Sequence, residues 1–218
     1  MSKIKKIVFI WTNLGLILIL LAGGFLACIF AMISATSGSS GGGIVNSDSL
    51  KNLNDEQKAF INSILSGTMK SYQQYKVFPS VTVAQAIIES GWGKSELAIQ
   101  GRNLFGIKAD AGWKGETLLM STNEEYGGHT VTEMAVWRKY NSFDDSVEDH
   151  GKFLAENSRY ALAGVFEAKN YKEQITAIKN AGYATESDYV DIICGTIECY
   201  GLNALDGTTT TVNNGTIE

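Results

Sequence analysis

Cysteine, histidine and proline are scarce in this chain of 218 residues, which has three, two and one of them respectively. No group of Cys and His has the spacing of a zinc site. Cys194 and Cys199 stand five apart on a predicted helix, in poor geometry for a disulfide, and we interpret them as small buried hydrophobic residues. The sequence therefore predicts no metal site, and no motif in it indicates a cofactor.

Positive charge is also scarce beyond the first few residues. Residues 7–33 contain no charged side chain, and only Lys3, Lys5 and Lys6 precede them. From residue 34 onward, 15 Lys and Arg stand against 23 Asp and Glu, a net charge of about −8. Nucleic-acid binding draws most of its affinity from neutralising phosphates, so a domain this acidic is a poor candidate for it. We expect no nucleic-acid partner.

The uncharged segment 7–33 predicts a transmembrane anchor. A helix needs roughly 20 apolar residues to cross a bilayer core about 30 Å thick, and the hydrophobic core of a signal peptide is shorter, at about 7–15 residues. A buried core helix, or cleavage after the span, are the alternatives. The positive-inside rule places residues 1–6 in the cytoplasm and the residues from about 34 onward outside the cell membrane. The anchor and the scarcity of cysteine favour a Gram-positive bacterium.

The rest of the chain divides into a linker, one domain and a tail. Residues 34–49 are rich in Ser and Gly and predict a flexible linker, and residues 206–218 predict a disordered tail. Residues 50–205 predict a mainly α domain of the α+β type. Helices are expected at 53–75, 81–89 and 94–100, the first with a capping box of Asn54 and Gln57, and after caps at Ser80, Ser142, Asn170 and Thr185. A hairpin of strands 117–123 and 130–140 is expected between them. Both faces of the second strand carry apolar residues, so neither face can be assigned to the core.

Glu89 is the first candidate for chemistry. It ends an apolar helix, and Ser90-Gly91-Trp92-Gly93 follows it. The negative end of the helix dipole and any desolvation both disfavour ionisation there, and so raise the pKa of the carboxyl. A raised pKa is what a general acid needs at neutral pH. A solvent-facing glutamate at a helix end gives the same pattern, so the residue alone leaves both interpretations open.

The predicted hairpin holds a second candidate, the adjacent Glu124 and Glu125. Neighbouring side chains on a strand point to opposite faces, so at most one of the two can share a site with Glu89. A solvated acidic turn is the alternative. Aromatic residues that could stack on sugar rings occur near both candidates, among them Trp92, Phe105 and Tyr126.

Five motifs follow one another along the chain: AQAIIESGWGKS at 84–95, NLFGIK at 103–108, WRKY at 137–140, SFDDS with a later DH at 142–150, and GYAT with a later Tyr at 182–189. In this order and spacing they resemble glycoside hydrolase family 73, the peptidoglycan-cleaving N-acetylglucosaminidases of autolysins and flagellar hydrolases. Any one motif is weakly specific. The ordered set, which covers roughly residues 55–203, is strongly specific.

The resemblance implies a lysozyme-like fold and an endo-β-N-acetylglucosaminidase that cleaves the β-1,4 bond between GlcNAc and MurNAc. It makes Glu89 the general acid. Thr122-Asn123-Glu124 matches the family's Thr-x-Glu pattern, which favours Glu124 as the second carboxylate, whereas the family's frequent Glu followed by Tyr favours Glu125. The predicted substrate-binding residues are Trp92, Asn103, Phe105, Tyr126, Tyr183 and Tyr189.

Some of these residues have a second interpretation. Tyr183 and Tyr189 could equally be core aromatics, and Asn103 and Phe105 are expected to shape the site rather than react. His150 is interpreted as a hydrogen-bonded core histidine.

Two kinds of rival function remain open. A lytic transglycosylase or a muramidase of the same fold would need only Glu89, and a non-catalytic wall-binding or assembly module is the alternative from another class. The expected partners are peptidoglycan glycan strands and, through residues 7–33, the membrane. A domain tethered to the membrane in this way is compatible with a role beside membrane-associated secretion, conjugation or division machinery.

Overall fold

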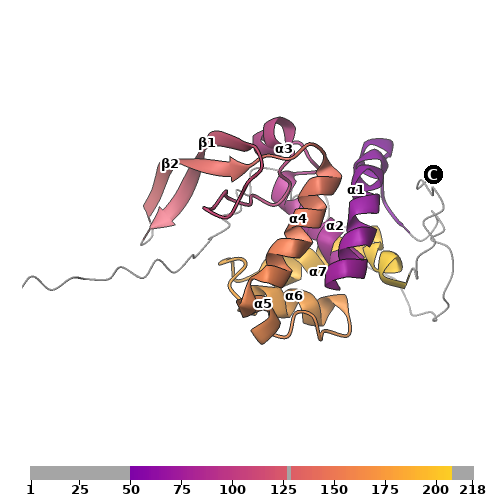
Figure 1. The fold of residues 1–218 in the computed structure, drawn as a ribbon. Helices are drawn as coiled ribbons and strands as arrows, with labels where there is room; N and C mark the ends of the chain where they lie inside the picture. Colours follow the sequence, from indigo (N-terminus) through magenta and orange to yellow (C-terminus); the bar gives the residue numbers. More distant parts are fainter. Residues whose placement is uncertain (1–49, 127–128, 208–218) are drawn as a thin grey trace, which may run out of the picture.

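The computed structural model describes residues 50–126 and 129–207. This part of the chain forms a body of helices from which a two-stranded antiparallel hairpin projects (Figure 1). The elements in chain order are α1 (Asp55–Tyr75), α2 (Pro79–Ser90), α3 (Glu96–Gly101), β1 (Thr117–Tyr126), β2 (His129–Arg138), α4 (Phe143–Glu156), α5 (Ser158–Leu162), α6 (Tyr171–Asn180), α7 (Tyr189–Tyr200) and the 3₁₀ helix η3 (Leu202–Gly207). The prediction of a mainly helical domain with a central hairpin is confirmed.

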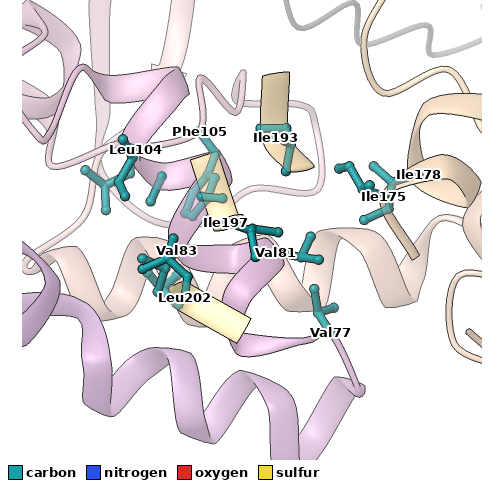
Figure 2. Close-up of a cluster of buried hydrophobic side chains, with 14 of the residues drawn as sticks. Val77, Val81, Val83, Leu104, Phe105, Ile175, Ile178, Ile193, Ile197 and Leu202 are labelled. Carbon is teal, nitrogen blue, oxygen red and sulfur yellow. The ribbon is translucent and has the colours of Figure 1, made fainter. Parts of the chain in front are cut away.

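Helix α2 lies at the centre of the helical body, where it contacts α1, α6, α7 and η3. Ten of its twelve residues are buried, and only Ile88 and Glu89 are partly exposed. Figure 2 shows Val81 of α2 in one apolar cluster with Ile193 and Ile197 of α7. Because nearly the whole of α2 is packed in the core, the position of Glu89 at its end is fixed by hydrophobic burial.

Three of the predicted helix caps are confirmed. The side chain of Asn54 accepts from the Gln57 amide at 2.9 Å, and the Gln57 side chain accepts in return from the Asn54 amide at 3.0 Å. Ser142 and Asn170 cap α4 and α6 in the same way, by accepting from the backbone amides three residues later, at 3.0 and 2.9 Å. Each of these caps depends only on residues within one turn, which explains why the pattern is legible in sequence.

Two of the predicted caps are wrong. Helix α2 begins earlier than expected, at Pro79, whose fixed φ suits the first helical position, so Ser80 lies inside the helix. Helix α7 begins after Asp188, with no capping bond from a side chain, and Thr185 lies upstream of it.

The carboxylate of Asp206 takes the place of a local cap on α2. It accepts from the Ser80 amide at 2.8 Å and from the Ser80 hydroxyl at 2.6 Å. Asp206 was expected to begin the disordered tail, but it belongs to η3, and the folded domain extends to Gly207. Burial raises the pKa of Asp206 to about 6, against the opposing effect of the two bonds from Ser80.

The two faces of the hairpin differ sharply. Ala135 and Trp137 are buried against the domain, whereas Leu119, Met134 and Val136 on the other face are 61, 60 and 44% exposed. Sequence could not choose between two apolar faces, because the choice depends on which side the rest of the chain covers.

The root of the hairpin is tied to α4. The Arg138 guanidinium at the end of β2 donates to Asp149 of α4 at 2.8 Å and to Asp110 at 3.1 Å. The Tyr140 hydroxyl donates to the same Asp149 oxygen at 2.7 Å. These bonds set the direction in which the hairpin leaves the helical body.

No helix in the described part of the chain is long and apolar enough to cross a bilayer. The predicted anchor at residues 7–33 and the linker at 34–49 lie outside the described residues, so both stay predictions.

Candidate active site

Glu89 lies in the last turn of α2 and is half-buried. The helix stops directly after it, because Gly91, Trp92 and Gly93 adopt left-handed backbone conformations with φ of 57°, 63° and 74°. The Ser90 hydroxyl secures this turn by donating to a carbonyl one turn earlier in α2 (2.5 Å) and accepting from the Gly93 amide (2.7 Å). The ESGWG stretch thus ends the helix abruptly and holds the carboxyl at its C-terminus.

The surroundings raise the pKa of Glu89 to about 8. Burial is the main cause, since desolvation penalises the charged form, and the negative charge of Glu186 adds to it. A hydrogen bond from the Tyr189 hydroxyl to Glu89 Oε1, at 3.1 Å, acts in the opposite direction. Glu89 is therefore mostly protonated at neutral pH, as a general acid must be.

Tyr189, the first residue of α7, joins Glu89 to a third side chain. Its hydroxyl oxygen accepts from Gln85 Nε2 at 2.8 Å, and Gln85 lies one helical turn before Glu89 in α2. Sequence reasoning gave Gln85 no role. The signal that could have found it is its spacing of four residues from Glu89, which puts both side chains on one face of the helix.

Tyr183 forms a second aromatic contact beside the site. Its ring lies 6.0 Å from that of Tyr189, and its hydroxyl lies 3.3 Å from His150 Nε2. Burial raises the pKa of Tyr183, and the charge of Glu89 adds to this effect. Burial lowers the pKa of His150 to about 3. His150 is thus a neutral, hydrogen-bonded core histidine, as predicted.

Asn103 and Phe105 lie behind the site. The Asn103 amide donates to the carbonyls of Ile107 and Arg138, both at 2.9 Å, and its oxygen accepts from the Ile107 amide at 3.1 Å. Phe105 stacks on the His150 ring, with centroids 4.0 Å apart. Both are buried, as are Tyr183 and Tyr189, so these four predicted substrate-binding residues present almost no surface to a sugar in this structure. Asn103 and Phe105 shape the site by holding the hairpin root and the histidine.

Trp92 is half-buried and packs by its edges. Its ring centroid lies 5.9 Å from that of Phe60 in α1 and 5.1 Å from that of Tyr200 in α7. Trp92, three residues after Glu89 in the chain, stays partly exposed, so stacking on a sugar remains a prediction for this residue.

The hairpin candidates lie at the far end of β1. Glu124, Glu125 and Tyr126 pair with Val131, Thr130 and His129 of β2. The side chains of residues 123–130 lie outside the described part, so the choice between Glu124 and Glu125 and the role of Tyr126 stay predictions.

Glu186 is a carboxylate that sequence reasoning missed. It lies in the loop before α7, three residues from Tyr189, and acts electrostatically on Glu89. Within the described residues its Oε2 atom is buried and has no hydrogen-bond partner. Nothing local in the sequence marks it, because its nearness to Glu89 comes from the packing of α2 against α7.

The chemical step that the described site can perform is the donation of a proton from one carboxyl group. Among residues 50–126 and 129–207, no group of three or more His, Cys, Asp or Glu side chains could hold a metal ion. The described site brings together a protonated glutamic acid, two phenols and a second carboxylate, an arrangement that suits acid catalysis.

Comparison with known proteins places these residues in a family. A profile of the glucosaminidase family, described as mannosyl-glycoprotein endo-beta-N-acetylglucosaminidase, matches residues 67–202, a segment that contains Glu89, the hairpin and both tyrosines. The chain is 42% identical over 155 residues to Exo-glucosaminidase LytG of Bacillus subtilis, covering 70% of this chain and 54% of that protein. It is 35% identical over 140 residues to Peptidoglycan hydrolase FlgJ of Vibrio parahaemolyticus, covering 63% and 45%.

A solved structure of a similar protein supports the same assignment. The catalytic domain of the autolysin Auto from Listeria monocytogenes superimposes with a TM-score of 0.63 at 34% identity, covering 72% of this chain and 91% of that domain. The chain spans about half the length of the two curated relatives above. On the profile match, which covers more than half of the sequence, the chain belongs to the glucosaminidase family of glycoside hydrolases.

Proposed function

We propose that this chain is a peptidoglycan hydrolase that cleaves the β-1,4 bond between GlcNAc and MurNAc, with Glu89 as the general acid. The observation that carries the proposal is the position of Glu89 at the end of the buried helix α2, hydrogen-bonded to Tyr189 inside the family-matched segment, where burial raises its pKa to about 8. A carboxyl that is protonated at neutral pH can pass its proton to the glycosidic oxygen as the bond breaks, so that the leaving sugar departs as a neutral alcohol. The relatives named as a glucosaminidase and a peptidoglycan hydrolase support this substrate class.

For the second carboxylate we assign Glu124. Strand periodicity gives position 124 the same face of β1 as Thr122, which is buried, whereas position 125 shares the face of Ser121 and Leu119, which are exposed. Glu124 would act as a base on the attacking water or stabilise the positive charge that develops on the sugar ring. A route assisted by the substrate's own N-acetyl group would need only Glu89.

The test of the enzyme assignment is Glu89→Gln, which keeps the shape of the side chain and removes the acid proton. We expect the rate of cell-wall digestion to fall about 100-fold or more. Glu167→Gln, a change of the same kind at an exposed glutamate in the loop before α6, is the matched control and should digest wall at the wild-type rate. A wild-type protein that clears no wall, or a Glu89→Gln protein that clears it equally well, contradicts the assignment.

The bond assignment is tested on the products. Mass spectrometry of digested wall should find fragments with a reducing GlcNAc end. A reducing MurNAc end would indicate a muramidase, and anhydro-MurNAc a lytic transglycosylase. The size of the early products separates endo from exo cleavage, since an endo enzyme releases long glycan fragments first.

We also propose that residues 7–33 anchor the chain and hold the domain outside the membrane. A Ser/Gly linker of the length of 34–49 would keep the domain within a few tens of ångströms of the bilayer. The test is protease treatment of intact protoplasts that carry an epitope tag at residue 1. The domain should be digested and the tag protected. A digested tag, or a chain that salt washes off the membrane, would overturn the topology.

A further inference from the structure

Two successive hydrogen bonds lead to Glu89, and the first donor in this series is the side-chain amide of Gln85. Gln85 Nε2 donates to the Tyr189 hydroxyl oxygen at 2.8 Å, so this oxygen acts as an acceptor on that side. The hydroxyl's own hydrogen is then available for Glu89 Oε1, at 3.1 Å. The result is a one-way series of donors that runs from Gln85 through Tyr189 to Glu89.

The environment of the series enforces this direction. Gln85 and Tyr189 are 0 and 1% exposed, so water does not compete for either group. Within the described residues the other polar atom of the amide, Gln85 Oε1, has no hydrogen-bond partner. If the amide were reversed, Oε1 would accept the Tyr189 hydrogen and Glu89 would lose its donor. A buried N–H is also more costly to leave unpaired than a carbonyl oxygen, which favours the same orientation.

The direction has a consequence for the acid proton. Glu89 Oε1 already accepts the hydrogen of Tyr189, which makes Oε1 the poorer of the two carboxyl oxygens for carrying the proton. We propose that Gln85 is a positioning residue: by orienting the Tyr189 hydroxyl toward Oε1, it directs the acid proton of Glu89 to Oε2, the oxygen left for the glycosidic bond. This inference rests on the proposed role of Glu89 as the general acid.

Gln85 can be tested without altering the charge of the site. Among the described titratable groups, Tyr189 in the first turn of α7 and Glu186 in the loop before it act on Glu89, and the charge of Glu89 acts on Tyr183 in the same loop. Asp206 contacts the opposite end of α2. Gln85 itself carries no charge, so replacing it changes the orientation of a hydroxyl and leaves every charge in place.

The decisive variant is Gln85→Leu, which has a similar volume and no donor. Without its partner, the Tyr189 hydroxyl no longer stabilises the ionised form of Glu89, so the basic limb of the pH profile of kcat/KM should move up by about one unit. We expect kcat to fall roughly 10-fold with little change in KM, because a misdirected proton affects the transition state more than binding. An unchanged limb in a folded Gln85→Leu protein overturns the proposal.

Thr82→Val is the matched control. Thr82 lies on the same helix, is equally buried, and has a hydroxyl with no hydrogen-bond partner among the described residues. Its replacement tests whether any loss of a buried polar group in α2 moves the profile. We expect the basic limb to stay in place, and a shift as large as that of Gln85→Leu would show that the effect is general damage to the helix.

The double variant Gln85→Leu/Tyr189→Phe separates positioning from structural support. If Gln85 acts through Tyr189, the double variant should be no slower than Tyr189→Phe alone, whereas the rate losses from two independent structural defects would multiply.

Should Gln85→Leu fail to fold, Gln85→Met takes its place with the same expected shift of the basic limb. Glu89→Gln distinguishes the two levels of failure: full activity there removes the proposed function itself, and its loss together with an unmoved limb in Gln85→Leu removes only the positioning role.

Discussion

The two sides of the site are built in contrasting ways. On the helical side, Glu89 is held by a buried helix and a series of buried hydrogen bonds. On the hairpin side, the strands are tied to the body at their root, and the outer face exposes large apolar side chains to solvent. The difference indicates that the pKa of the acid is set by a closely packed environment, while the hairpin, from which we propose that Glu124 acts, is an arm held to the body at its root.

The largest expected effect comes from Asp149→Ala, which removes the hydrogen bonds that tie the root of the hairpin to α4. Arg138 would lose its closest carboxylate partner, and the Tyr140 hydroxyl would lose its acceptor in a largely buried position. Removing one partner of such a pair destabilises a protein by about 3 kcal/mol. Urea denaturation should show a loss of this size together with reduced wall digestion. If stability falls while activity per folded molecule is unchanged, the root does not position the hairpin for catalysis.

An intermediate effect is expected on the helical side, from Glu186→Gln. The negative charge of Glu186 raises the pKa of Glu89, so removing it should lower that pKa and move the basic limb of the activity profile to lower pH. Because burial is the larger cause, we expect a shift of less than about one unit. This is opposite in sign to the shift expected for Gln85→Leu. An upward shift would mean that Glu186 acts on Glu89 through something other than its charge.

The smallest effect is expected on the outer face of the hairpin, from Met134→Thr. Met134 is 60% exposed, and Thr suits a strand, so the free energy of unfolding should change by no more than about 0.5 kcal/mol. Thermal melting and wall digestion measure the two consequences. A clear loss of digestion with unchanged melting would show that this face contacts the wall or another protein.

Features that depend on neighbours in sequence could be predicted, and features that depend on packing could not. The caps at Asn54, Ser142 and Asn170 and the helix end after Glu89 are local, and the structure has them where the pattern placed them. The carboxylate of Asp206 reaches Ser80 across 126 residues, and no local pattern marks such a contact.

The same distinction, between what local sequence predicts and what packing decides, applies to the candidate site. The raised pKa of Glu89 could be anticipated because helix ends and apolar helices are visible in sequence. Glu186 and the orientation of Tyr189 depend on how α2 meets α7, which no periodicity reports. Asn103 lies in a family-like motif, and only its three internal hydrogen bonds reveal that it supports the hairpin root.

A carboxyl with a raised pKa lies at each end of helix α2: Asp206 of η3 contacts its first turn, and Glu89 lies in its last turn. A group whose pKa is higher in the folded chain than in the unfolded chain stabilises the fold at low pH, and this stabilisation is lost as the pH rises through the folded value. For Asp206 the loss begins near the ordinary aspartate pKa of 3.8 and is complete near its folded pKa of about 6, and for Glu89 it begins near 4.5 and is complete near about 8. Rising pH therefore weakens the scaffold before it removes the acid proton, because most of this stabilisation is already lost at the pH at which Glu89 ionises in the folded chain.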